Sequence, residues 1–67
     1  MIRLRVKEVA KEKGISMGKL SRTADIAYNT IKRIYADPYR DVSMHTLDKL
    51  ARALGVPAEE LIETVSE

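Results

Sequence analysis

The sequence predicts an all-α fold, a compact bundle of five short helices that forms one domain over residues 1–67. Apolar residues recur three and four positions apart along most of the chain, and no segment alternates apolar and polar residues as a half-buried strand does. The chain also contains no cysteine, tryptophan or phenylalanine. Aliphatic helices therefore have to supply the core, since no disulfide is available to staple it.

The first helix is expected over residues 4–13. Val6, Val9 and Ala10 lie at positions i, i+3 and i+4, so they share one face of this helix. Gly14 follows, and glycine ends helices readily because it adopts the left-handed conformation without steric cost. The helix is therefore expected to stop there.

A second helix is expected to follow directly and to end in a short corner. Ser16 is a typical N-cap for it, and Leu20 and Ala24, four residues apart, share its inward face. Residues 25–27 are too few for anything but a sharp turn, in which Ile26 supplies an apolar plug.

The third helix is expected over residues 28–36, with Ile31 and Ile34 facing inward. It should end at Asp37, because a residue that precedes proline disfavours the helical conformation. Its outward positions carry hydrogen-bond donors and an amphipathic ring instead of carboxylates: Tyr28, Asn29, Lys32 and Arg33. A helix with these side chains on one face is suited to the major groove of DNA.

The fourth helix is expected to begin after Ser43 and to end at Gly55. Its inward positions are Met44, Leu47, Leu50, Ala51 and Leu54. These five side chains are expected in the core.

A fifth helix is expected to start at Pro57, with Glu59 and Glu60 near its positive N-terminal dipole. Its apolar face would hold Leu61, Ile62 and Val65. Residues 64–67 are expected to fray.

Charge is distributed unevenly along the chain. Residues 1–40 carry a net charge of +6 and residues 41–67 a net charge of −4, which together give +2. Small helical proteins can have an uneven charge distribution by chance, but here the basic part of the chain also contains the two helices joined by the tight turn. This coincidence favours a polyanionic partner for the first part of the chain.

Two blocks of the chain resemble the lambda-repressor and Cro-like, or XRE-type, helix-turn-helix family. The first is SMGKLSRTADIAYNTIKRI over residues 16–34, and the second is SMHTLDKLARALGVPAEELI over residues 43–62. The resemblance extends from about Val6 to Ile62 and implies a five-helix DNA-binding domain whose second and third helices form the helix-turn-helix. It also implies a sequence-specific transcriptional regulator, most often a repressor.

The resemblance implies a set of DNA-contacting residues. Asn29 can pair with adenine and Arg33 with guanine, while Tyr28 can pack on a thymine methyl group or hydrogen-bond a phosphate. The full candidate set is Ala27, Tyr28, Asn29, Lys32, Arg33, Lys19, Arg22 and Arg40. Lys19, Arg22, Lys32 and Arg40 are assigned to phosphates by their charge and reach.

The chain departs from the family pattern at several positions. The glutamine that usually begins the second helix is Met17, the turn glycine is Asp25, and the serine that usually caps the recognition helix is Ala27. An arginine–glutamate pair that often joins the first and third helices is replaced by Ala10 and Tyr35. We expect Tyr35 to pack where that ion pair would lie.

Assembly and partners follow from the same resemblance. Family relatives act as two-fold dimers on near-palindromic DNA, so a homodimer is expected, at least on DNA, with its interface near residues 54–62. The alternative function is an antitoxin or accessory module whose main partner is a protein. Loss of binding with rising salt distinguishes the two, because only DNA binding releases condensed counterions.

Enzyme and membrane functions are not expected. His45 is the only histidine and there is no cysteine, so a metal site is not expected, and no cofactor is implied. Gly14, Gly18 and Gly55 are too scattered for a phosphate-binding loop. No apolar leader and no run of about 18–20 apolar residues is present, so a cytoplasmic protein is expected.

Overall fold

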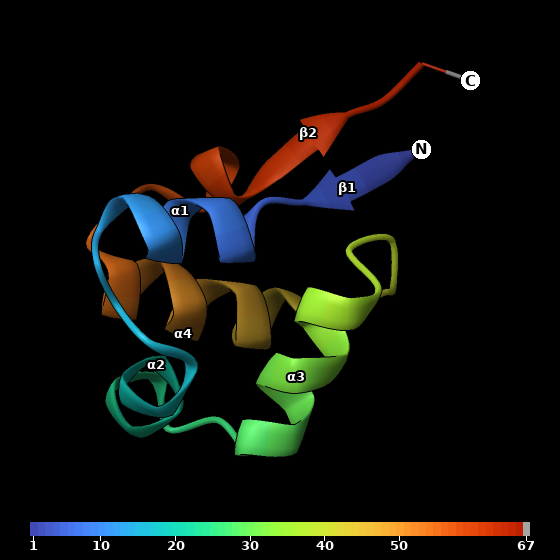
Figure 1. Ribbon diagram of the computed structural model, residues 1–67. Helices are drawn as coiled ribbons and strands as arrows, with labels where there is room; N and C mark the ends of the chain where they lie inside the picture. Colours follow the sequence, from blue (N-terminus) through green and yellow to red (C-terminus); the bar gives the residue numbers. More distant parts are fainter. Residues whose placement is uncertain (67) are drawn as a thin grey trace.

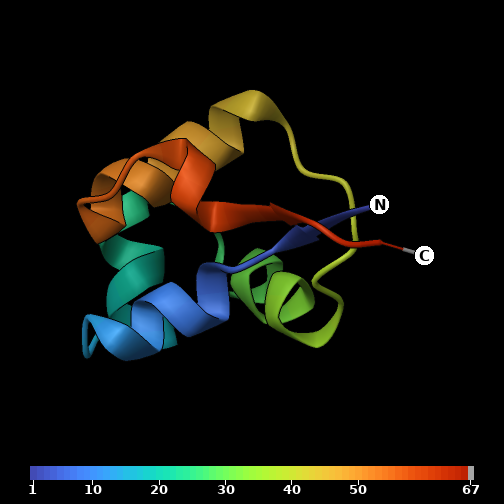
Figure 2. The same ribbon diagram turned by 90° about the horizontal axis from the view of Figure 1, so that it is seen from above.

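The computed structural model describes residues 1–66, which form four α-helices, one 3-10 helix and a two-stranded antiparallel sheet (Figure 1). In chain order these are β1 (Ile2–Leu4), α1 (Val6–Glu12), α2 (Met17–Ala24), α3 (Tyr28–Ala36), α4 (Met44–Leu54), the 3-10 helix η1 (Ala58–Leu61) and β2 (Ile62–Thr64). The four α-helices form the body of the molecule. The sheet lies beside α1 and brings the two ends of the chain together, as both views show (Figure 2).

The core is aliphatic and draws on every α-helix, on β1 and on η1. Its buried residues are Leu4, Val6, Val9, Ala10, Leu20, Ala24, Ile31, Ile34, Leu50, Ala51, Leu54 and Leu61. Burial of each large side chain stabilises the fold by about 1.5–3 kcal/mol. No polar or charged side chain of residues 1–66 is buried in it, so the core itself is held together by apolar packing.

Local signals placed the helix ends correctly in several cases. The Ser16 Oγ accepts a hydrogen bond from the backbone N–H of Lys19 at 3.2 Å, and the Ser43 Oγ accepts one from Thr46 at 3.0 Å. Gly14 and Gly55 have φ angles of 68° and 70°, the left-handed conformation expected after α1 and α4. The predicted caps and stops of these helices are therefore confirmed.

The all-α, five-helix prediction is wrong at both ends of the chain. Leu4 belongs to β1 and not to the first helix, which begins at Val6. The expected fifth helix is only the short η1, after which the backbone becomes extended at Ile62. Pairing between the two ends decides this outcome, with Ile2 opposite Thr64, Arg3 opposite Glu63 and Leu4 opposite Ile62. Three-residue strands are too short to show a sequence period.

The predicted fraying of residues 64–67 is corrected for Thr64 and Val65, and so is the predicted place of Val65 on a helix face. Thr64 is paired in the sheet, and the backbone N–H of Val65 donates to the carbonyl oxygen of Met1 at 2.8 Å. Val65 is half-buried and lies beyond β2, so it is not on a helix face. Glu67 lies outside the described residues.

Two predicted core positions are exposed. Met44, the first residue of α4, is 87% exposed, and Ile62 is 36% exposed. Met44 has the correct helical spacing from Leu47, but it lies in the first turn of α4, next to the loop, where it is left uncovered. Leu61 is fully buried as predicted.

Arg3 links the sheet to α1. Its Nη1 donates to the carboxylates of Glu8 on α1 and of Glu63 on β2, the latter at 2.8 Å. The hydrogen bond to Glu8, followed by that to Glu63, raises the pKa of Arg3 above its ordinary value. The charged guanidinium therefore ties β1 to the neighbouring α1 and to β2, whose Glu63 is 60 positions away in the sequence.

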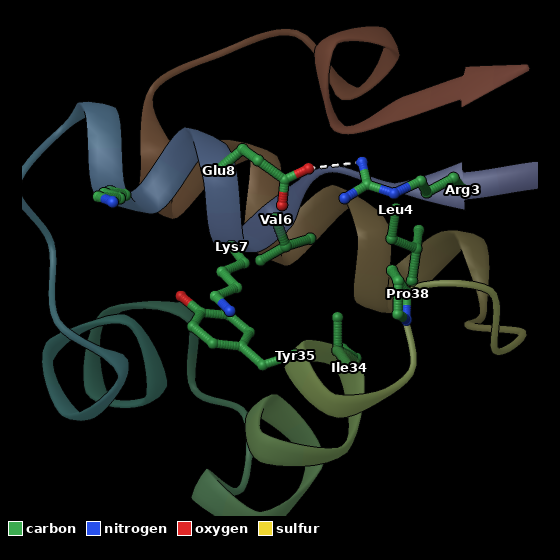
Figure 3. A pocket seen from close by; sticks show the side chains of 9 residues that line it. Arg3, Leu4, Val6, Lys7, Glu8, Ile34, Tyr35 and Pro38 are labelled. Atoms are coloured by element: carbon green, nitrogen blue, oxygen red, sulfur yellow. Dashed lines mark hydrogen bonds and ion pairs between the residues drawn. The ribbon is translucent and has the colours of Figure 1, made fainter. Parts of the chain in front are cut away.

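A groove of about 420 Å³ lies between α1 and the end of α3 (Figure 3). Lys7 and Tyr35 extend into the same space from the two helices, and the Arg3–Glu8 pair lies at one end. Tyr35 is half-buried and packs against the core. Burial, assisted by the charge of Glu8, raises the pKa of its hydroxyl above the ordinary value. Tyr35 therefore joins α3 to the core by packing, as expected from the replacement of the ion pair.

Candidate nucleic-acid interface

The turn between α2 and α3 depends on a left-handed residue. Asp25 has φ 56° and ψ 49°, a conformation in which glycine is usual and aspartate is tolerated better than most residues. The backbone N–H of Ile26 then donates to the carbonyl oxygen of Ser21 at 3.1 Å. Ile26 itself is half-buried and packs against the core, which confirms its predicted role as an apolar plug.

Two side chains fasten this turn. The hydroxyl of Ser21 donates to the carbonyl oxygen of Ile26, and Nζ of Lys49 on α4 donates to the carbonyl oxygen of Asp25 at 3.3 Å. The turn is thus held from α2 and from α4. Since the direction of α3 depends on this turn, both contacts help to fix α3 relative to α2.

The inner and outer faces of α3 differ completely. Ile31 and Ile34 are 0% and 2% exposed, and they anchor the helix in the core. The predicted outer positions are all exposed: Tyr28, Asn29, Lys32 and Arg33. Within residues 1–66, the ion pairs involve neither Lys32 nor Arg33. These two cations are therefore available to an external anion.

The beginning of α3 offers backbone donors as well. Ala27 precedes the helix with an extended backbone and, unlike serine, has no side-chain acceptor for the first amides. Among the described residues the first intrahelical bonds come from Thr30 and Ile31, both to the carbonyl oxygen of Ala27. The N–H groups of Tyr28 and Asn29 thus remain free to bind an anion next to the exposed side chains.

The remaining predicted residues lie outside α3, two of them on α2 and one in the loop that follows α3. Lys19 and Arg22 are exposed on α2, the first helix of the helix-turn-helix, and the Arg22 guanidinium extends back toward Gly18. Arg40 is exposed in the loop that follows α3, at the opposite end of that helix from Tyr28 (Figure 1). The structure therefore groups α2 and the start of α3 on one surface, and it separates Arg40 from that surface.

A comparison with known families shows what kind of domain this chain forms. The Cro/C1-type HTH DNA-binding domain matches residues 5–67 of the chain. The chain belongs to the Cro/C1-type helix-turn-helix DNA-binding family. The resemblance read from residues 16–34 and 43–62 is thereby confirmed. A comparison with curated proteins found no match.

Membership in the Cro/C1-type family places this domain among DNA-binding proteins, with double-stranded DNA as its partner. No helix in residues 1–66 is long and apolar enough to span a membrane. The same residues hold no group of three or more histidine, aspartate or glutamate side chains arranged for a metal ion.

Sequence reasoning missed one residue that this Cro/C1-type domain uses. Lys49 is outside the candidate set read from the sequence, yet its side chain hydrogen-bonds the turn at Asp25. The two residues are 24 positions apart, and no local pattern indicates that they meet. Only the packing of α2 on α4 brings them together.

Proposed function

We propose that this Cro/C1-type domain is a sequence-specific transcriptional regulator that inserts α3 into the major groove and represses by occupying its operator. The proposal rests on the difference between the buried and the exposed face of α3. Ile31 and Ile34 are buried, while Asn29, Lys32 and Arg33 are exposed and face outward together. A rigidly seated helix with polar, unpaired side chains on its outer face matches the requirements of base reading.

Within this proposal, Asn29 reads adenine and Arg33 reads guanine, each discriminating against the wrong base by about 1–3 kcal/mol. Tyr28 packs on a thymine methyl group or bonds a phosphate, and Ala27 adds a small methyl surface. The free N–H groups at the start of α3 also hold a phosphate. The phosphate-contacting side chains are Lys19, Arg22, Lys32 and Arg40.

The proposal includes a homodimer on a near-palindromic operator. One α3 covers only part of such a site, and a two-fold pair would place the two α3 helices about 34 Å apart, one turn of DNA. Residues 1–67 act in this scheme as a single domain.

The experiment that tests the function is selection of bound sequences from a random double-stranded DNA library. Fluorescence anisotropy then measures affinity for the selected site at several salt concentrations. We expect a near-palindromic site and a log–log salt slope of about −0.9 for each phosphate contact. Arg33→Glu and Lys32→Glu should each lower the affinity about tenfold to a hundredfold, the equivalent of losing a base contact or reversing a phosphate contact.

Lys7→Glu is the matched control, because it makes the same change of charge on an exposed residue of α1. In Figure 1, α1 lies across the helical body from the start of α3. Its effect on affinity should be small. If Lys7→Glu weakened binding as strongly as Arg33→Glu, or if all DNA sequences bound equally, α3 would not be reading bases. An antitoxin or accessory module with a protein partner would then be the better assignment.

A further inference from the structure

The groove between α1 and the end of α3 is separate from the surface proposed to bind DNA. It measures about 420 Å³, which is within the size range of pockets that hold small organic molecules. None of the residues proposed to contact DNA lines it. In Figure 1, α1 lies across the helical body from the start of α3. DNA binding by α3 therefore leaves this groove without a role.

The floor of the groove is apolar and rigid. Leu4, Val6 and Ile34 line it, and each is at most 5% exposed. Pro38 and Tyr35 add to the lining, and both are half-buried. Because the floor residues belong to the core, the groove exists before any ligand arrives. An apolar body placed on this floor leaves water without requiring the chain to rearrange.

The charged residues around the groove are mostly cationic. Arg3, Lys7 and Lys11 line it against a single carboxylate, that of Glu8. Glu8 already accepts a hydrogen bond from the Arg3 guanidinium, which also binds Glu63. The ion pairs within residues 1–66 involve neither Lys7 nor Lys11, and both are exposed. Two cations at the groove are therefore available to an anion.

Helical spacing places these two lysines together. Lys7 and Lys11 are four residues apart, so they lie one turn apart on the same face of α1. Figure 3 shows Lys7 extending from α1 into the groove, toward Tyr35 on α3. Lysines on an exposed helix face usually contact only water, but these two border an apolar floor. A ligand that has both an anionic end and an apolar end can use the two features at once.

Tyr35 supplies a hydrogen-bond donor on the opposite wall. Its hydroxyl takes part in none of the side-chain hydrogen bonds within residues 1–66. Burial, assisted by the charge of Glu8, raises the pKa of this hydroxyl, so it keeps its proton at neutral pH. A protonated hydroxyl can donate to an anion. The groove thus has donors on both walls, an ammonium group on α1 and a hydroxyl on α3.

We propose that this groove binds a small organic anion that has an apolar body and a carboxylate head. The body lies on the buried floor, and the head lies between the two walls, where Lys7, Lys11 and the Tyr35 hydroxyl donate to it. A free inorganic anion lacks the body, and a neutral aromatic molecule lacks the charge. Neither should bind as tightly as a molecule that has both.

An NMR titration of the full chain with naphthoate tests this site. Naphthoate carries one carboxylate on a two-ring apolar body, and two-dimensional proton–nitrogen spectra at constant ionic strength follow its binding. We expect a dissociation constant of about 1 mM or lower, the affinity that the binding energy per atom of small ligands gives for a molecule of this size. The largest shifts should occur at the amides of Lys7, Ile34 and Tyr35.

Two related molecules separate the contribution of the charge from that of the apolar body. Naphthamide has the same rings without the charge, and it should bind about tenfold more weakly than naphthoate. Inorganic phosphate has the charge without the rings, and an equal concentration of it should not displace naphthoate. If phosphate displaced naphthoate at equal concentration, the groove would hold an adventitious ion only, and the proposal would be overturned.

Substitutions in the groove test the assigned residues. Lys7→Ala and Lys11→Ala should each weaken naphthoate binding about threefold, and the double variant about tenfold. Tyr35→Phe keeps the ring, removes the donor and should weaken binding about threefold. Lys13→Ala is the matched control, because Lys13 is exposed at the end of α1 and does not line the groove. Circular dichroism confirms that each variant is folded.

The proposal is overturned if the folded double variant of Lys7 and Lys11 binds naphthoate like the unaltered chain, or if the unaltered chain shows no binding. It is also overturned if that double variant, without naphthoate, loses affinity for the selected DNA as strongly as Arg33→Glu does. The groove would then hold a DNA phosphate. Failure of the DNA-binding proposal is recognised separately, because naphthoate would bind although no DNA sequence was selected. Arg33→Glu should keep the full affinity for naphthoate.

Discussion

Nζ of Lys49 donates a hydrogen bond to the carbonyl oxygen of Asp25, 3.3 Å away, and so joins α4 to the turn between α2 and α3. The bond uses the backbone of Asp25 and leaves its side chain free. The left-handed conformation of Asp25 is therefore held from outside, although its side chain makes that conformation costly. The turn therefore requires a left-handed backbone at position 25, but it does not require the side chain of aspartate there.

The first prediction concerns the cost of that conformation. Asp25→Gly should raise the free energy of unfolding by about 0.5–1 kcal/mol, because glycine has no Cβ to strain the left-handed backbone. Asp25→Val should lower it by about 1–2 kcal/mol for the opposite reason. Urea denaturation measures both. Asp25→Asn controls for the lost charge and should stay near the value of the unaltered chain; a rise equal to that of Asp25→Gly would assign the gain to charge instead.

A second prediction uses the two kinds of helix start in this chain. Ala27 has the extended backbone of an N-cap without a capping side chain, whereas Ser43 caps α4 through its Oγ. Ala27→Ser should therefore stabilise the domain by about 1 kcal/mol, and Ser43→Ala should destabilise it by a similar amount. Thermal unfolding of the two variants checks this. Equal and small effects would mean that capping contributes little here.

The third prediction follows from the raised pKa of Tyr35. Burial and the nearby Glu8 favour the neutral hydroxyl in the folded chain, while the unfolded chain loses this proton near pH 10. The stability due to Tyr35 is thus complete below pH 10 and is lost as the pH rises through the higher folded value. Tyr35→Phe should flatten the fall in thermal stability above pH 10. Tyr39→Phe, at an exposed tyrosine, is the control and should leave the fall unchanged.

The fourth prediction contrasts two apolar residues of α4. Met44 is 87% exposed and Leu50 is fully buried, although both fit the inward spacing of the helix. Met44→Ala should change the free energy of unfolding by less than about 0.5 kcal/mol. Leu50→Ala should cost about 2–5 kcal/mol, which includes the cavity it leaves. A large loss in Met44→Ala would place that side chain in a contact that the monomer does not show.

Much of the candidate site could be predicted from the sequence because its determinants are local. The bounds of α3, its buried Ile31 and Ile34, and its exposed outer residues follow from helical spacing and from the proline at position 38. The unusual residue in the turn, Asp25, was also recognisable as a left-handed position. The base-reading roles of Asn29 and Arg33 remain predictions, since they depend on the sequence of the bound DNA, which the amino-acid sequence does not specify.

By itself, the sequence determined the family, the caps at Ser16 and Ser43, and the helix-turn-helix, because each depends on residues no more than a few positions apart. Only the tertiary structure decided that the chain ends pair as β1 and β2, that Lys49 reaches the turn, and that Arg3 meets Glu63. The physical reason is common to all three. Each contact joins residues that are distant in the sequence. Its formation depends on how the helices pack, and no local pattern of apolar residues indicates that packing.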